Sequence, residues 1–123
     1  MKKFALAVAA MLIAPSAFAL ELRDVVGQYR IRQPGLPTYY TARIDGIGAL
    51  YLTVHSNRGT LECRGVAQMI QNTLESALSC DDGRAFEHKI YFQGVRVRAP
   101  VFQARVYSSA DGRVRLMNFR RLR

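Results

Sequence analysis

Hydrophobic and polar residues alternate with a period of two along most of the chain beyond Asp24. Successive side chains of a β-strand point to opposite faces, so each alternating run predicts a strand with one buried face. The runs cover residues 25–32, 39–44, 50–55, 61–69, 74–81, 86–93, 95–107 and 114–122. Turn-forming dipeptides such as Asp45-Gly46, Asp82-Gly83 and Asp111-Gly112 lie between several of them. The pattern therefore predicts an all-β chain of about eight strands.

The spacing of these runs favours one architecture. Strands that recur every 8 to 12 residues or so are typical of an all-β sandwich or barrel. The connections are short, so sequential strands are expected to pair as antiparallel neighbours in a meander. Eight strands can close and thereby remove both exposed edges of the sheet. We therefore predict a small meander barrel, with a β-sandwich as the alternative; Pro100 marks an edge or a bulge in the run over 95–107.

The segment between Cys63 and Cys80, the chain's two cysteines, fits a second pattern, because its apolar residues also recur at helical spacing. A disulfide needs Cα atoms within about 7 Å of each other. A helix over residues 66–78 would instead rise about 18 Å. A turn at Gln71-Asn72 places Cys63 directly opposite Cys80 and gives the pair of strands one largely apolar face. We therefore predict a hairpin with a cross-strand Cys63–Cys80 disulfide.

The first 19 residues have a different composition. Lys2 and Lys3 precede an apolar run over 4–14, and Ala17-Phe18-Ala19 provides the small residues of a cleavage site. This is the layout of a secretory signal peptide, and the apolar run is shorter than the roughly 17 to 25 residues of a membrane span. We predict cleavage after Ala19, which leaves a single β domain over residues 20–123. A bacterial periplasm, or the medium after secretion, would allow the disulfide to form.

Arginine dominates the charge of this domain. Of the 18 basic residues, two lie in the predicted signal peptide, so 16 remain against 9 acidic ones, a net charge of +7. All but Lys89 of these 16 are arginine, whose forked guanidinium suits phosphate and carboxylate groups. In a closed barrel the first and last strands become neighbours and would bring several arginines onto one sheet face. The anion-binding candidates are Arg30, Arg32, Arg96, Arg98, Arg105, Arg113, Arg115, Arg120 and Arg121.

Motifs of catalysis and metal binding are absent from the sequence. The two histidines are His55 and His88, and no serine lies in a Gly-x-Ser-x-Gly context. His88 falls on the apolar face of its strand, where a hydrogen-bonded core histidine is the favoured interpretation. No His/Cys cluster has zinc spacing, and the cysteines are expected to pair. We therefore expect no catalytic residue, metal or cofactor, and a protein that is not an enzyme.

Gly27-Gln28-Tyr29 on the first predicted strand resembles the G-x-W that opens many calycin and lipocalin barrels, with Tyr in place of Trp. In that superfamily a basic residue from the last strand packs over the aromatic ring. The resemblance implies that Arg120 or Arg121 packs over Tyr29 in the same way. It covers three residues and the general layout, and it implies a small barrel.

These observations leave three functions open. The first is a non-catalytic, exported domain whose arginine-rich face binds an anionic lipid, an acidic glycan or an acidic protein of the cell envelope; nucleic acid fits that compartment poorly. The second is a barrel that carries an apolar ligand, with an interior lined by Leu50, Leu52, Phe86, Phe92 and Phe102. For a domain of only 104 residues, however, we expect side chains to fill the barrel. The third is inhibition of a secreted hydrolase by the loop over residues 33–38. The alternative to a binding face is a solvated surface that serves solubility.

Overall fold

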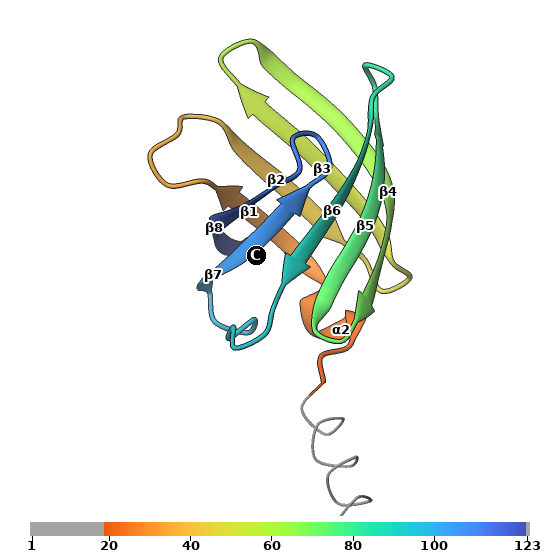
Figure 1. The fold of residues 1–123 in the computed structure, drawn as a ribbon, viewed down its shortest axis with the longest axis vertical. Helices are drawn as coiled ribbons and strands as arrows, with labels where there is room; N and C mark the ends of the chain where they lie inside the picture. Colours follow the sequence, from red (N-terminus) through yellow and green to blue (C-terminus); the bar gives the residue numbers. More distant parts are fainter. Residues whose placement is uncertain (1–18, 123) are drawn as a thin grey trace, which may run out of the picture.

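Figure 1 shows the computed structural model of the chain, which describes residues 19–122. Within this range, eight antiparallel strands follow one another around a closed barrel, and the last strand pairs with the first. The strands are β1 (Gly27–Arg32), β2 (Tyr39–Ile44), β3 (Ala49–Ser56), β4 (Gly59–Ile70), β5 (Thr73–Cys80), β6 (Ala85–Tyr91), β7 (Val101–Ser108) and β8 (Arg113–Leu122). A helical turn, α2 (Leu22–Val25), precedes β1. The predicted meander barrel is therefore confirmed, and the alternative sandwich is not formed.

Apart from Ala19, the signal peptide predicted for residues 1–19 lies outside the described residues. Its cleavage and the resulting domain boundary stay predictions. In the part of the chain from 19 to 122, no helix has both the length and the apolar character needed to cross a membrane.

The predicted hairpin between the cysteines is confirmed in register and in its covalent link. Cys63 lies directly opposite Cys80 in the β4–β5 pair, and the two form a disulfide. Gln71 and Asn72 form the two-residue turn with φ angles of 48° and 64°. Two left-handed residues in succession are the type I′ geometry whose twist matches that of the flanking strands. The distance limit of the disulfide thus distinguishes correctly between the helix and the hairpin.

Two predicted strands begin later than expected. The strand predicted over 25–32 begins at Gly27, because Val25 ends α2, in which the Asp24 carboxylate accepts a hydrogen bond of 2.8 Å from the Glu21 backbone N–H. The strand predicted over 95–107 begins only at Val101. Residues 92–100 instead form a loop that ends at Pro100, which has no N–H to donate to a sheet. Val97 in this loop is buried, so the loop packs inward.

Close approach of β4 to β5 depends on Gly65. A Cβ atom added there would lie 1.7 Å from the carbonyl oxygen of Ala77, a distance no side chain can occupy. Glycine therefore lets the long β4 strand bend against its neighbour, which is a common use of glycine where a barrel wall curves.

The best-packed part of the core lies at one end of the barrel. Phe102 stacks on Phe119 with ring centroids 5.0 Å apart, and the Tyr29 ring meets Phe102 edge-on at 6.2 Å. Val25 of α2 is buried at the same end, where Figure 1 also shows the β4–β5 turn. Edge-to-face and offset contacts between aromatic rings favour this arrangement beyond the area they bury. This end of the barrel is therefore closed by rings and by α2.

Candidate ligand cavity

The barrel interior is hollow beyond this aromatic cluster. A cavity of about 640 Å³ extends from Val25 and Phe92 at one end to Gln33 and Arg113 at the other. Pockets that hold drug-sized ligands measure roughly 300 to 1,000 Å³. The expectation that side chains fill the barrel is therefore wrong. An eight-stranded barrel is wide enough to hold one small ligand when its inward residues are not large, and Ala42 is one such small residue in the wall.

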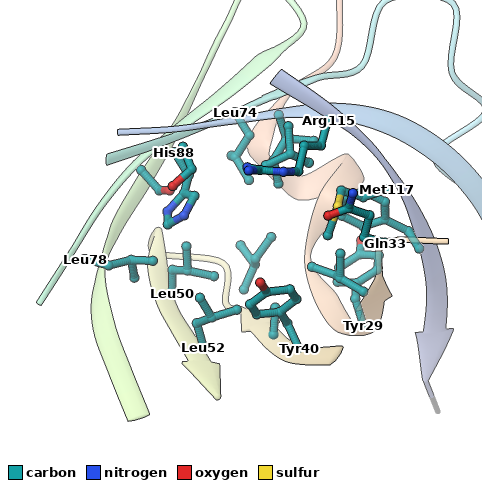
Figure 2. Close-up of a pocket in the computed structure, with 18 of the residues that line it drawn as sticks. Tyr29, Gln33, Tyr40, Leu50, Leu52, Leu74, Leu78, His88, Arg115 and Met117 are labelled. Carbon is teal, nitrogen blue, oxygen red and sulfur yellow. The ribbon is translucent and has the colours of Figure 1, made fainter. Parts of the chain in front are cut away.

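Aliphatic side chains make up most of the cavity wall. Figure 2 shows them pointing inward from several strands, among them Leu50, Leu52, Leu74, Leu78 and Met117. Of the interior residues expected from the sequence, Leu50, Leu52, Phe92 and Phe102 line the cavity. Phe86 does not line it; the Arg84 guanidinium lies 5.4 Å from the centre of its ring. An apolar molecule in the cavity would therefore contact aliphatic side chains from several strands.

We call the end formed by Val25, Tyr29, Val97 and Arg121 the closed end. Arg121 lies on β8 with its guanidinium 5.0 Å from the centre of the Tyr29 ring. Its two terminal nitrogens donate to the carbonyl oxygens of Val26 (3.0 Å) and Val97 (2.9 Å), whereas its buried Nε has no partner within residues 19–122. The Tyr29 hydroxyl donates to the Val25 carbonyl at 2.7 Å. Arg121 thus provides the packing that the lipocalin resemblance implies, and it ties Val26, just before β1, and the 92–100 loop to β8.

We call the opposite end, formed by Gln33, Thr38, Asp111, Arg113 and Arg115, the open end, because its residues are exposed or half-buried. Arg115 donates a hydrogen bond to the Asp111 carboxylate, and the other Asp111 oxygen accepts from the Arg113 backbone N–H at 3.0 Å. The hydrogen bond from Arg115 lowers the pKa of Asp111, and the same bond raises the pKa of Arg115. Both groups are therefore charged at neutral pH. Figure 2 shows the Arg115 guanidinium inside the cavity.

A polar pair interrupts the apolar wall between the two ends. Ser76 on β5 lies opposite His88 on β6, and both line the cavity. The His88 Nδ1 atom is buried and has no hydrogen-bond partner within residues 19–122, so the interpretation of a hydrogen-bonded core histidine is wrong at this nitrogen. Burial also lowers the pKa of His88, which favours the neutral ring.

Four arginines form what we call the outer basic face: Arg30, Arg32, Arg43 and Arg120. Arg30 pairs directly with Arg120 in the β1–β8 register, and all four side chains are exposed. The guanidiniums of Arg30 and Arg32 lie 5.2 and 5.6 Å from the Tyr39 ring centre, within the range of cation–π contact. Within residues 19–122, none of the four takes part in a salt bridge.

The other candidates lie elsewhere, so the single basic face expected from the sequence is divided. Arg113 and Arg115 line the cavity because they share the inward phase of β8 with Met117. Arg96 and Arg98 lie on the 92–100 loop, where Arg98 pairs with Asp24 at 3.1 Å. Arg105 is exposed on β7 opposite Leu116, apart from the outer basic face, and Arg121 is at the closed end.

No family model, curated protein or solved structure matches this chain. Among residues 19–122, no three His, Cys, Asp or Glu side chains gather as a metal site requires. The geometry of the cavity and of the outer basic face therefore carries the functional argument. Sequence reasoning missed the cavity residues Gln33, Tyr40, Ser76 and Asp111. Every second residue of a strand points to the same face. Alternation from Phe119 through Met117 therefore places Arg115 and Arg113 on the inward face as well.

Proposed function

We propose that this barrel is a non-catalytic binding domain that holds one elongated, largely apolar molecule in its interior. The observation that carries the proposal is the cavity of about 640 Å³ with an aliphatic wall and one charged end. Water in such a cavity finds few polar partners, so its replacement by an apolar chain is favourable. Each methylene group removed from water contributes about 0.8 kcal/mol.

The two ends of the barrel support entry from one side. At the closed end, Val25 and Val97 are 1% and 4% exposed, which leaves no passage for a chain. At the open end, Asp111 and Arg113 are exposed. An amphipathic molecule would therefore enter with its apolar tail first and leave its polar end beside these charged groups.

An uncharged, apolar dye tests whether the cavity binds apolar molecules, because no electrostatic attraction contributes to its affinity. N-phenyl-1-naphthylamine fluoresces in apolar surroundings, and we expect it to bind the purified, disulfide-bonded protein with one-to-one stoichiometry. Leu52→Trp fills part of the cavity and should weaken binding at least tenfold. Tyr51→Trp is the matched control, because Tyr51 immediately precedes Leu52 in β3 and points outward. Absence of dye binding, or equal binding by both variants, would contradict the proposal.

As a second candidate, we propose that the outer basic face docks on an anionic membrane surface. The supporting observation is that Arg30, Arg32, Arg43 and Arg120 are exposed together and none of them, within residues 19–122, takes part in a salt bridge. The Tyr39 ring beneath two of them adds an amphipathic side chain suited to a lipid headgroup region. Several clustered arginines near an anionic surface contribute about 1 kcal/mol each.

Sedimentation with vesicles tests this second candidate. We expect binding to vesicles that contain phosphatidylglycerol, weakening steeply as salt rises, and little binding to phosphatidylcholine alone. Arg30→Glu combined with Arg120→Glu should abolish it. Arg58→Glu combined with Arg96→Glu, an equal change of charge at two exposed residues away from this face, is the control and should retain most of it. Equal loss in both variants would mean that net charge, rather than this face, governs binding.

A further inference from the structure

The ion pair at the open end has an arrangement suited to partner exchange. Arg115 points into the cavity (Figure 2). Its partner Asp111 lies in the turn between β7 and β8. One Asp111 oxygen accepts from Arg115, and the other accepts from the Arg113 backbone N–H at 3.0 Å. The second bond anchors the turn on its own. Arg115 can therefore leave Asp111 without unfolding the turn.

Charge at this end favours an anion. The charged groups that line the cavity at the open end are Arg113, Arg115 and Asp111, which leaves an excess of one positive charge. A guanidinium has five N–H donors, and it can bind both oxygens of a carboxylate side by side. The side chains of Arg115 and Asp111 are 34% and 36% exposed, so an incoming head group can reach them.

Uncharged polar groups lie on the same rim. Tyr40 and Gln33 line the cavity together with Arg115, and Figure 2 shows all three in one view of it. A hydroxyl and a carboxamide can each donate a hydrogen bond to an oxygen that Arg115 does not hold. Below this rim, the wall turns aliphatic at Leu52 and Met117. From the mouth inward, the wall thus changes from charged and polar groups to mainly apolar ones, with Ser76 and His88 as the polar exception.

We propose that the ligand of this cavity is an amphiphile with one acidic head group, and that this head group replaces the Asp111 carboxylate as the partner of Arg115. The inference rests on the proposed function, since it names the class of molecule that the cavity holds. Asp111 then occupies the place of the head group in the empty barrel and competes with it. The apolar tail provides most of the affinity, and Arg115 provides the selection for an acid.

A series of ligands with one chain length tests the head group directly. Dodecanoic acid, dodecanol, dodecylamine and dodecyl phosphate are measured by displacement of N-phenyl-1-naphthylamine. We expect the acid to bind about tenfold to a hundredfold more tightly than the alcohol, as a charge-assisted hydrogen bond allows, and the amine to bind most weakly. The one excess positive charge at the open end matches a head group with a single negative charge, so tighter binding of the phosphate than of the acid would contradict the inference.

Two variants assign the selection to the ion pair. Arg115→Gln should remove the preference for the acid and leave the alcohol within about twofold, whereas Arg105→Gln, an equal charge change on the outside of β7, should preserve it. Asp111→Asn keeps an oxygen for the Arg113 N–H but removes the competing charge, so the acid should bind several-fold more tightly. Asp81→Asn, in the exposed β5–β6 turn, is its matched control and should leave the acid unchanged.

Carbon-13 NMR of the Asp111 carboxyl provides a readout independent of affinity. Because the bond from Arg115 lowers the pKa of Asp111, loss of that bond should raise the pKa when dodecanoic acid is bound and leave it unchanged with dodecanol. Equal binding of acid and alcohol, with no NMR change, overturns the head-group inference while the cavity remains a binding site. Failure of every amphiphile and of the dye removes the proposed function as well.

Discussion

Arg115 and Arg121 lie on the same inward face of β8, at opposite ends of the barrel, yet their partners differ in kind. Arg121 donates to two backbone carbonyl oxygens and covers the Tyr29 ring. Arg115 donates to one side-chain carboxylate at a mouth that is open to solvent. A backbone carbonyl in a packed loop cannot be exchanged without unfolding that loop, whereas a side chain in a turn can be displaced. An inward-facing arginine of β8 therefore holds the fold together at one end, whereas at the other end it has an exchangeable partner, as the proposed binding of a ligand requires.

The same contrast holds for the side chains that surround each arginine. At the closed end, Phe102 and Phe119 stack beside Tyr29, and these rings bound the cavity there. Toward the open end, aliphatic residues such as Leu52 line a hollow interior. Rings that bury large areas stabilise the barrel at the closed end. The rest of the interior can then remain empty without loss of the fold.

The largest effect should come from Arg121→Met at the closed end. This change leaves the partly buried carbonyl oxygens of Val26 and Val97 without their donor, at a cost of about 1–2 kcal/mol each. We expect the free energy of unfolding, measured by urea titration, to fall by about 2–4 kcal/mol.

Two methionine variants of the same strand are the controls for this prediction. Arg120→Met removes the neighbouring, exposed guanidinium and should change the free energy of unfolding by less than about 0.5 kcal/mol. Arg115→Met breaks a partly exposed ion pair and should cost less than about 1 kcal/mol. If Arg115→Met destabilised the protein as much as Arg121→Met does, the two ends would not differ in the way described.

The fold could be predicted from the sequence to a large extent. The alternation of residues identifies each strand locally, and the disulfide limits the distance between two of the strands. The position of Cys63 opposite Cys80 followed from a distance limit. Neither the cavity nor the close approach of Gly65 to Ala77 could be predicted, since both depend on how the closed barrel curves. The alternating pattern says which residues point inward, but it does not say how much space they leave.

The prediction that Arg113 and Arg115 lie on an outer sheet face is wrong for a physical reason. The usual rule places apolar residues inside and polar ones outside, but at the first half of β8 the pattern is inverted. Val114 and Leu116 are 52% and 47% exposed on the outer surface, whereas Arg113 and Arg115 line the open end of the cavity, which is accessible to solvent. Near an opening, inward-facing residues of a barrel are exposed to solvent and can therefore be charged. An inverted stretch at the end of a strand is therefore itself a signal of a polar cavity mouth.

His88 should make the stability of the protein depend on pH in the mildly acidic range. Burial lowers the pKa of His88 in the folded protein, so the unfolded chain takes up a proton first as pH falls below about 6.5. The unfolded state then binds more protons than the folded state, and the free energy of unfolding falls by up to about 1.4 kcal/mol per pH unit until folded His88 also titrates. Above about pH 7, this contribution is constant.

Urea titrations at pH 7.5 and 5.5 check this sign. His88→Gln should reduce the loss of stability between the two pH values. His55→Gln is the control, because His55 stacks on Tyr39 at a ring distance of 4.4 Å on the outside of the barrel. An equal or larger loss in His88→Gln than in the unmodified protein would show that other groups cause the pH dependence.

Tyr29→Phe should give an effect of about 1 kcal/mol, since it removes one buried hydrogen bond and keeps the ring. The hydroxyl donates to the Val25 carbonyl, which joins α2 to β1. We expect the free energy of unfolding to fall by this amount and the dye affinity to stay within about twofold. A loss of dye binding without a loss of stability would place the Tyr29 hydroxyl among the ligand contacts rather than in the closure of the barrel.

The smallest effect concerns the turn between β4 and β5, which lies at the closed end. Gln71 adopts a φ of 48°, a conformation that asparagine tolerates better than glutamine. Gln71→Asn should therefore raise the free energy of unfolding by about 0.5 kcal/mol. Asn72→Gly suits the turn equally well, but it removes the side chain that accepts from the Leu20 N–H at 2.7 Å, so its gain should be smaller. If Asn72→Gly were the more stabilising change, the contact between residue 20 and this turn would contribute nothing to the closed end.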